Sequence, residues 1–208
     1  MDNFFKLRAD RQRHIIDAAL VQFGRNGYKK TSIADIAEQA GIAKGMVSYY
    51  FGSKKNLYLY LAEFCAQMLV EEIGASYDKT VIDFFDRIKM LTEIKMAVIK
   101  RQAASVSFMA GLYLETDPAV YTELKAFIKD GAAIRDKWIA DGADLTKFHS
   151  DVDPKLLERF LVWAGEGMAK DLSQDEGISQ LEASVETFYR CLDSMKKYFY
   201  KEETPCRD

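Results

Sequence analysis

Cysteine and histidine are scarce in this chain of 208 residues, and their scarcity excludes several kinds of site. The three cysteines, Cys65, Cys191 and Cys206, lie far apart without a paired-cysteine motif, and only two histidines are present. Neither a disulfide framework nor a metal site is therefore expected. We expect Cys65 and Cys191 to be small buried hydrophobic residues, and we expect no cofactor.

Long uncharged runs are missing as well. Charges begin at Asp2 and recur through the first residues, which leaves no apolar stretch for a signal peptide. The longest uncharged segment, Gln102 to Leu114, is shorter than the roughly 20 residues that a membrane-spanning helix needs. We therefore expect a cytoplasmic protein with no membrane partner.

Motifs of common enzyme classes are also absent. Lys30 and Thr31 resemble the end of a phosphate-binding loop, but Lys29 stands where that loop requires glycine. Neither GxSxG nor HExxH occurs, and His14 and His149 have no motif partner nearby. We expect the protein not to be an enzyme.

Alternation of apolar and polar residues is too short anywhere to indicate a strand, and the chain contains three prolines. These features predict an all-α fold of about nine helices. Asp117 with Pro118, and Asp153 with Pro154, each combine an N-cap residue with proline at the first helical position. The expected helices span 9–26, 32–40, 43–51, 54–74, 80–101, 103–114, 118–141, 154–171 and 178–201. We divide them into an N-terminal helix-turn-helix domain, 1–52, and a larger ligand-binding and dimerisation domain, 53–208.

The net charge of −3 argues at first against a nucleic-acid partner, but the charge is unevenly distributed. Residues 1–57 contain 10 Lys and Arg against 5 Asp and Glu, whereas the remainder contains 19 against 27. This division indicates a basic segment that meets an acidic partner and an acidic body with another task.

The basic segment has the pattern of a helix-turn-helix. Two short helices, 32–40 and 43–51, are separated by Gly41 and follow a longer first helix. In such a motif the last helix enters the major groove of DNA, and the helix before it crosses the backbone. Lys44 opens the last helix, and Lys54 and Lys55 follow it, so positive charge is available for phosphate contacts.

The segment from Arg13 to Leu57 closely resembles the DNA-binding domain of TetR-type transcriptional regulators. It reads RHIIDAALVQFGRNGYKKTSIADIAEQAGIAKGMVSYYFGSKKNL and makes up 45 of the 208 residues. The matching positions are Ala18, Ala19, Phe23, Gly27, Tyr28, Thr31, Ser32, Ile33, Ile36, Ala37, Ala40, Gly41, Gly45, Tyr49, Phe51, Ser53, Lys54 and Leu57.

The resemblance implies roles for individual residues. Thr31 and Ser32 correspond to phosphate contacts from the second helix, and Lys44 with Gly45 corresponds to the base and backbone contact. Tyr49 corresponds to the aromatic residue that reaches a phosphate or a thymine methyl. The remaining expected DNA contacts are Tyr50, for which core packing is the alternative, and Lys54 and Lys55.

Three residues of the third helix depart from the family pattern. Ala43 replaces the usual Ser or Thr cap, Met46 replaces a polar residue, and Ser48 replaces a tyrosine. We place Met46 and Ser48 in the DNA contact, with Met46 against thymine methyls and with DNA shape contributing to recognition.

The family implies a homodimeric repressor that binds a palindromic DNA operator and is released by a small molecule. The alternative is a ligand-independent architectural or cell-division factor on the same scaffold. Large apolar side chains in the body predict a hydrophobic or amphipathic effector, although such residues also form ordinary cores. The candidate pocket residues are Phe64, Met68, Phe108, Tyr113, Trp138 and Trp163.

The last two helices carry apolar residues at alternating spacings of 3 and 4, which suits helix-bundle packing. This apolar seam is either intramolecular core or a dimer interface, and we favour the interface because a palindromic operator needs two copies. The candidate interface residues are Leu161, Ala164, Met168, Leu181, Val185, Phe188, Leu192 and Met195.

Overall fold

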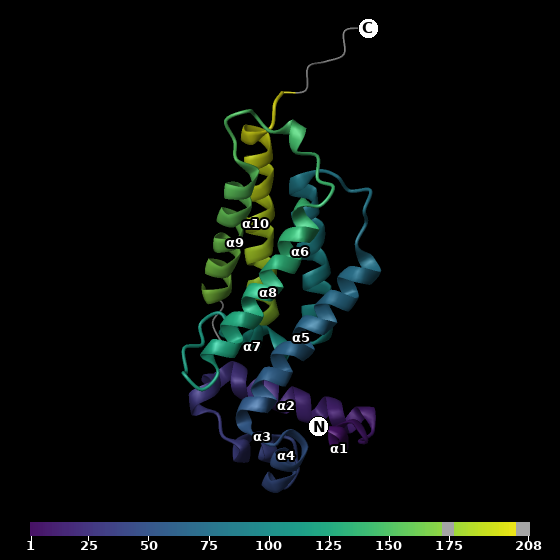
Figure 1. Ribbon diagram of the computed structural model, residues 1–208, viewed down its shortest axis with the longest axis vertical. Helices are drawn as coiled ribbons and strands as arrows, with labels where there is room; N and C mark the ends of the chain where they lie inside the picture. Colours follow the sequence, from purple (N-terminus) through teal and green to yellow (C-terminus); the bar gives the residue numbers. More distant parts are fainter. Residues whose placement is uncertain (172–176, 203–208) are drawn as a thin grey trace.

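The computed structural model of the chain describes residues 1–171 and 177–202, without the side chains of residues 166, 168–171, 177 and 178. It confirms the all-α fold. The α-helices are α1 (Asp2–Phe5), α2 (Ala9–Lys30), α3 (Ile33–Gln39), α4 (Lys44–Phe51), α5 (Lys54–Ser76), α6 (Phe84–Arg101), α7 (Ser105–Leu112), α8 (Tyr121–Ala140), α9 (Pro154–Asp171) and α10 (Gly177–Phe199). Helices α1 to α4 form a head at one end of an elongated body, and α5 runs from the head along that body (Figure 1).

The starts of α3, α5 and α9 follow from capping residues. Ser32 forms a capping box with Asp35 at the start of α3, and Ser53 caps α5. Asp153 accepts hydrogen bonds from the first amides of α9, so this helix begins at Pro154 as expected.

The starts of α6 and α8 differ most from the prediction, and both differences have a local cause. Helix α6 begins at Phe84 because Asp83, rather than Thr80, accepts hydrogen bonds from the backbone amides of the first turn. The carboxylate of Asp117 accepts the amide of Ala119 within a turn, so α8 begins only at Tyr121.

Helix α2 changes direction at Gly27. The backbone of Gly27 has φ 68° and ψ 177°, which residues with a side chain rarely adopt. The regular helix therefore ends close to the predicted Asn26, and Tyr28 to Lys30 form a short separate turn that leads into α3.

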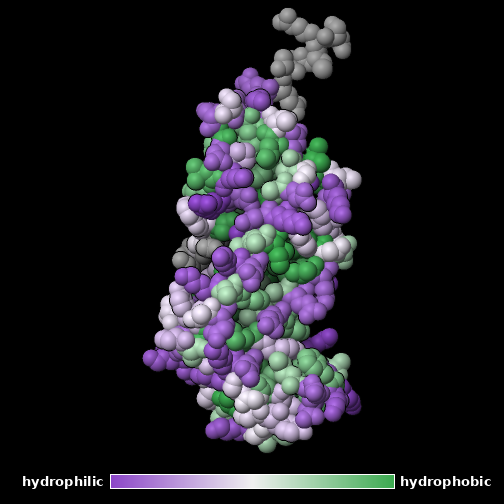
Figure 2. Space-filling model, viewed as in Figure 1, coloured by the Kyte–Doolittle hydropathy of each residue, from purple (hydrophilic) through white to green (hydrophobic). Residues whose placement is uncertain are grey.

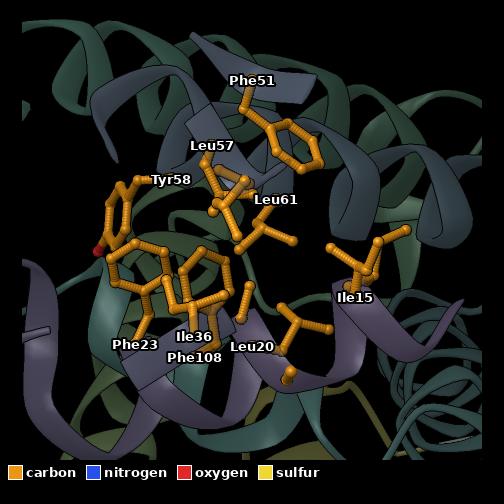
Figure 3. Packing of buried hydrophobic residues seen from close by; sticks show 14 of the residues in the cluster. Ile15, Leu20, Phe23, Ile36, Phe51, Leu57, Tyr58, Leu61 and Phe108 are labelled. Carbon is orange, nitrogen blue, oxygen red and sulfur yellow. The ribbon is translucent and has the colours of Figure 1, made fainter. Parts of the chain in front are cut away.

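A single hydrophobic cluster joins the head to the lower part of the body (Figure 3). Ile15, Leu20 and Phe23 of α2 face Leu57 and Leu61 of α5 in this cluster. Tyr58 of α5 and Phe108 of α7 lie against Phe23, with ring centres 4.9 and 6.4 Å from it. The core of the head is thus continuous with α5, α7 and α8 of the body, across the predicted division after residue 52.

Two further clusters lie within the body. Phe84, Phe85 and Ile88 of α6 belong to the upper one, and Met96 and Ile99 of the same helix belong to a smaller one. On the face seen in Figure 2, hydrophobic and hydrophilic side chains are interspersed over the body.

The cysteines only partly follow the prediction. Cys65 is buried, and burial raises the pKa of its thiol to about 12, so it acts as a small core residue. Cys191 is exposed on α10, so its predicted burial is wrong. Cys206 lies outside the described residues. None of the described helices has the length and apolar character needed to cross a bilayer.

Candidate nucleic-acid interface

Helices α3 and α4 are joined by a short turn in which Gly41 has φ 61°. The inward side of α4 is fixed to the head, because Val47 is fully buried and Phe51 packs 4.8 Å from Phe4, measured between ring centres. Ala43, at the N-cap of α4, makes no side-chain cap, as its lack of a hydroxyl predicts. The orientation of α4 therefore depends on packing rather than on its cap.

The opposite side of α4 faces outward. Lys44, Gly45, Ser48 and Tyr49 are exposed, and positions separated by one, four and five residues share one side of a helix. Nothing lies within 4 Å of the position that a Cβ of Gly45 would occupy, so the backbone is open there. Met46 is half-buried and packs partly against the head core.

The basic turn before α3 lies at the other side of the motif. Lys29 and Lys30 are exposed, and the exposed Ser32 begins α3. The hydroxyl of Ser32 accepts the backbone amide of Asp35 at 3.1 Å. Ser32 therefore stabilises the helix start that it presents at the surface.

Lys54 is engaged inside the protein. Its ammonium donates hydrogen bonds to the carbonyl oxygens of Tyr28, at 2.9 Å, and Thr31, at 3.1 Å. It also lies 4.3 Å from the centre of the Tyr28 ring, within the range of a cation–π interaction. The structure therefore gives Lys54 an internal capping role at the turn that leads into α3.

Three other predicted DNA contacts are also engaged within the chain. The Thr31 side chain is buried, and its hydroxyl donates to the carbonyl oxygens of Gln22 and Gly27. Tyr50 is 7% exposed and belongs to the head core, which was its alternative role. The ammonium of Lys55 lies 2.5 Å from the carboxylate of Glu123 on α8. Each of these three side chains thus has partners within the chain.

Helix α1 was not predicted, although it supports the interface. Phe4 is fully buried, and its ring centre lies 6.0 Å from that of Tyr50 and 5.9 Å from that of Tyr60. The apolar Phe4, Phe5 and Leu7 within an otherwise polar start were the available signal. Four residues are too few to show helical periodicity.

Comparison with known proteins identifies the segment. Residues 15–61 match the family model described as "Bacterial regulatory proteins, tetR family". The chain belongs to the TetR family of transcriptional regulators. It is 43% identical over 66 residues to the dual regulator CecR of Shigella flexneri, an alignment that covers 32% of this chain and 27% of CecR.

The similarity extends beyond the DNA-binding segment. The transcriptional repressor AcnR of Corynebacterium efficiens is 23% identical over 189 residues, which cover 86% of this chain and 92% of AcnR. A TetR-family regulator from Chloroflexus aurantiacus has the same fold, with a TM-score of 0.69 at 20% identity over 97% of this chain and 99% of that one. This chain is therefore similar to TetR-family regulators over most of its length.

In this TetR-family regulator, the head and body are linked by polar contacts as well as by the core. Glu115, between α7 and α8, accepts the backbone amide of Tyr28 at 2.9 Å. Gln102 donates a hydrogen bond to Asp17 of α2. These two contacts connect two body segments to the DNA-binding head.

The six predicted pocket residues of the regulator differ in burial and in their neighbours. Phe64 and Phe108 pack in or against the head core, and Trp138 lies beside Tyr77, with ring centres 5.7 Å apart. Trp163 is 60% exposed, so it does not line an enclosed pocket. The remaining two candidates are half-buried Met68 and exposed Tyr113.

The predicted dimer seam packs largely within one chain of the regulator. Leu161 and Leu192 are buried in the upper body cluster, and Phe188 and Met195 pack against it. Leu181 and Val185 pack against the smaller cluster. The seam is thus mainly intramolecular core, the alternative to an interface. Ala164 is half-buried, and the side chain of Met168 lies outside the described residues.

A different side of α9 is apolar and exposed. Leu156, Phe160 and Trp163 are 60%, 51% and 60% exposed, and their spacings of 4 and 3 place them on one side of the helix. Helix α10 lies beside α9 in the body (Figure 1). A row of large exposed apolar residues is typical of an interaction surface.

Proposed function

We propose that this TetR-family regulator is a ligand-responsive repressor that binds a palindromic DNA operator as a homodimer. The observation that carries the proposal is the outward side of α4, where Lys44, Ser48 and Tyr49 are exposed beside the open backbone of Gly45. A helix of this diameter fits the major groove, which is about 12 Å wide.

The phosphate contacts come from the basic residues that remain exposed. Lys29 and Lys30 lie just before α3, and Lys44 lies at the N-terminal end of α4, where the helix dipole also favours an anion. Ser32 adds a polar group at the start of α3. These residues replace Thr31, Lys54 and Lys55 in the expected phosphate contact.

Sequence recognition rests on few side chains. Ser48 supplies a hydroxyl, Tyr49 supplies a ring with a hydroxyl, and Met46 supplies an apolar contact that suits a thymine methyl. With so few hydrogen-bonding groups, the sequence-dependent shape of the DNA contributes part of the specificity.

The homodimer forms through the exposed apolar side of α9. Leu156, Phe160 and Trp163 cluster on a helix whose inward residues are already buried, so a second copy would bury the outward ones. Aromatic residues at the centre of an interface usually contribute much of its stability. A two-fold dimer matches the symmetry of a palindromic operator.

Release by an effector requires a connection between the body and the head. The amide of Tyr28 is held by Glu115, and the turn that contains Tyr28 leads directly into α3. A small molecule that displaces the segment between α7 and α8 would therefore move the DNA-binding helices. In a dimer, such movement changes the separation of the two α4 helices.

Selection of bound duplexes from a random DNA pool tests the proposal. We expect recovery of a palindrome with half-sites about one helical turn apart, since both α4 helices enter the major groove on one side of the DNA. Recovery of no common sequence would contradict the proposal. Loss of DNA binding on addition of a small molecule distinguishes a ligand-responsive repressor from an architectural factor.

A further inference from the structure

Ion pairs connect α6 and α10, which run antiparallel and side by side (Figure 1). The pairs lie at one constant register, and each joins a carboxylate to an ammonium: Asp86 with Lys196, Lys89 with Asp193, and Lys100 with Glu182. Between the second and the third of these pairs, the same register places Glu93 opposite Tyr189 and Met96 opposite Glu186. Among the described side chains, the series of ion pairs is thus interrupted over about three helical turns.

A groove of about 470 Å³ lies between the two helices in this interval. Met96 and Val185 form its floor, since Met96 is 8% exposed and half-buried Val185 packs against the smaller body cluster to which Met96 belongs. Ala97 is exposed beside them, and its small side chain leaves the groove open. The groove is mainly apolar, and its volume lies within the range of small-molecule sites, about 300–1,000 Å³.

The rim of the groove carries an excess of negative charge. Glu93 of α6 and Glu186 of α10 are both exposed and both line the groove. Among the described side chains, neither carboxylate forms an ion pair, whereas Lys100 at one end is neutralised by Glu182 at 2.6 Å. Lys89 at the other end is paired with Asp193. The described part of the rim therefore presents two carboxylates whose charge is not matched.

Tyr189 lines the groove opposite Glu93. Its ring is half-buried, and burial, together with the charge of Glu93, raises the pKa of its hydroxyl to about 12. The ammonium of Lys89 lies 5.9 Å from the centre of this ring, within the range of a cation–π interaction. Tyr189 therefore stays neutral at physiological pH and adds an aromatic wall to the groove.

The size of the groove favours a small molecule over a macromolecule. Its lining extends over residues 93–100 of α6 and 182–189 of α10, which is about 10 Å of each helix. A stable protein–protein interface buries about 800 Å² on each partner, with about 20–30 residues a side. Two turns of two helices supply fewer residues than such an interface needs.

We propose that the groove between α6 and α10 binds an organic cation with a short apolar chain, whose positive head lies between Glu93 and Glu186 and whose chain lies against Met96 and Val185. The head group supplies the positive charge where the series of ion pairs is interrupted. An anionic head would be repelled by both carboxylates, and a neutral ligand would gain only the apolar contact. The described lining contains none of the six predicted pocket residues, and the binding requires no DNA.

The test is an NMR titration of the full-length protein with isotope-labelled methionine methyl groups. Octyltrimethylammonium carries a cationic head, octanol a neutral head and octanoate an anionic head, and their shared eight-carbon chain is about as long as the groove. We expect octyltrimethylammonium to bind with a dissociation constant on the order of 1 mM, at least about tenfold more tightly than octanoate. The methyl resonance of Met96, assigned with Met96→Leu, should move, whereas that of Met109, which packs against the head core, should not.

A double variant tests the two carboxylates. Glu93→Gln with Glu186→Gln removes both charges, keeps the shape of the side chains, and is expected to weaken octyltrimethylammonium binding at least about tenfold while octanol binding stays the same. The matched control, Glu38→Gln with Glu63→Gln, removes the same charge from exposed positions on α3 and α5. It should bind octyltrimethylammonium like the original protein.

A second pair of variants tests the groove itself. Ala97→Trp fills the groove and should weaken binding at least about tenfold, whereas Ala183→Trp, at an exposed position of α10 outside the described lining, should not. Sedimentation velocity of Ala97→Trp examines another occupant, because a changed assembly state would show that a second copy of the chain covers the groove and would overturn the proposal.

The order of affinity among the three head groups needs no variant, so it tests the proposal even if a variant fails to fold. Octanoate or octanol binding as tightly as the cation, binding of none of the three, or an unchanged affinity of the folded double variant would overturn the proposal. Failure to recover an operator would not alter any of these outcomes, since the titration contains no DNA.

Discussion

The ammonium of Lys54 lies 2.9 Å from the carbonyl oxygen of Tyr28 and 4.3 Å from the centre of the same residue's ring. The first turn of α5 thereby holds the turn that follows Gly27. That turn leads into α3, so one lysine fixes the start of the helix-turn-helix against the long helix of the body.

Replacement of Lys54 tests this internal role. Lys54→Met is expected to lower the free energy of unfolding by about 1.5–3 kcal/mol, the usual contribution of hydrogen bonds to a charged group. Operator binding should weaken because α3 and α4 are less well fixed, yet its salt dependence should stay the same, since no phosphate contact is lost. Denaturant unfolding and binding across a salt series measure the two effects.

Lys55→Met is the neighbouring control for Lys54. Its pair with Glu123 is partly exposed, and such pairs contribute at most about 1 kcal/mol. A salt slope that falls by about one in Lys54→Met would instead assign Lys54 to a phosphate.

Replacement of Lys44 should have the opposite effects on stability and on salt dependence. Lys44→Ala should leave the unfolding free energy within about 0.5 kcal/mol, because the residue is exposed. It should reduce the slope of log affinity against log salt by about one. Lys129→Ala, on the exposed surface of α8, is the control and should change neither quantity. An unchanged slope in Lys44→Ala would exclude the proposed contact at the start of α4.

The two phenylalanines of α1 form a matched pair for a stability test. Phe4 is fully buried, so Phe4→Ala should cost about 3–5 kcal/mol and weaken operator binding, since α4 loses its support. Phe5 is 57% exposed, and Phe5→Ala should cost much less. Thermal and denaturant unfolding of both variants measure the difference. Equal costs would show that α1 does not hold α4 in place.

A charged substitution on the outward side of α9 tests the proposed dimer interface. Trp163→Asp is expected to produce folded monomers that bind the operator poorly, because a desolvated carboxylate at the interface is unfavourable. Val70→Asp, at an exposed position on α5, should remain dimeric. Sedimentation velocity measures the assembly state, and a dimeric Trp163→Asp would place the interface elsewhere.

The loss of folding stability at low pH should depend partly on Asp83. Its burial opposes ionisation, but hydrogen bonds from the Asp86 amide, Lys147 and Lys196 outweigh burial and lower its pKa. A carboxyl with a lower pKa in the folded state stabilises the protein above its unfolded pKa, near 3.9, and loses that contribution as pH falls through the folded value.

The corresponding variant is Asp83→Asn. It is expected to be less stable than the original protein at pH 7, with the difference shrinking as the pH falls below about 4. Asp130→Asn, at an exposed position on α8, is the control. Unfolding free energies measured at several pH values check the trend. A stability difference between Asp83→Asn and the original protein that increases as the pH falls would contradict the prediction.

The helix-turn-helix was predictable because its signals are local. Ser32 with Asp35, Gly41 and Ser53 each act within a few residues of their position in the sequence, and each lies at the expected helix end or turn. The roles of Lys54, Lys55 and Thr31 depend on partners in other elements. Sequence spacing does not show whether an exposed-looking lysine meets a carbonyl oxygen, a carboxylate or a phosphate.

The apolar seam of α9 and α10 illustrates a second limit of prediction from the sequence. Alternating spacings of 3 and 4 predict a packed helix side, but they do not show which chain supplies the neighbour. Leu192 is fully buried within one chain, whereas Trp163 lies outside the seam and is exposed. The exposed row on α9 differs from the seam because Leu157 and Leu161 are buried by the same chain, whereas Leu156, Phe160 and Trp163 are not.

The head and the body lie in close contact at Gly24 of α2. A Cβ at this position would lie 2.9 Å from the backbone nitrogen of Phe108 and 3.0 Å from the Cβ of Ser107. Helices α2 and α7 therefore touch backbone to backbone, with no flexible side chain between them to absorb a displacement. A displacement of α7 would therefore be transmitted directly to α2. The DNA-binding head and this part of the body are thus mechanically coupled.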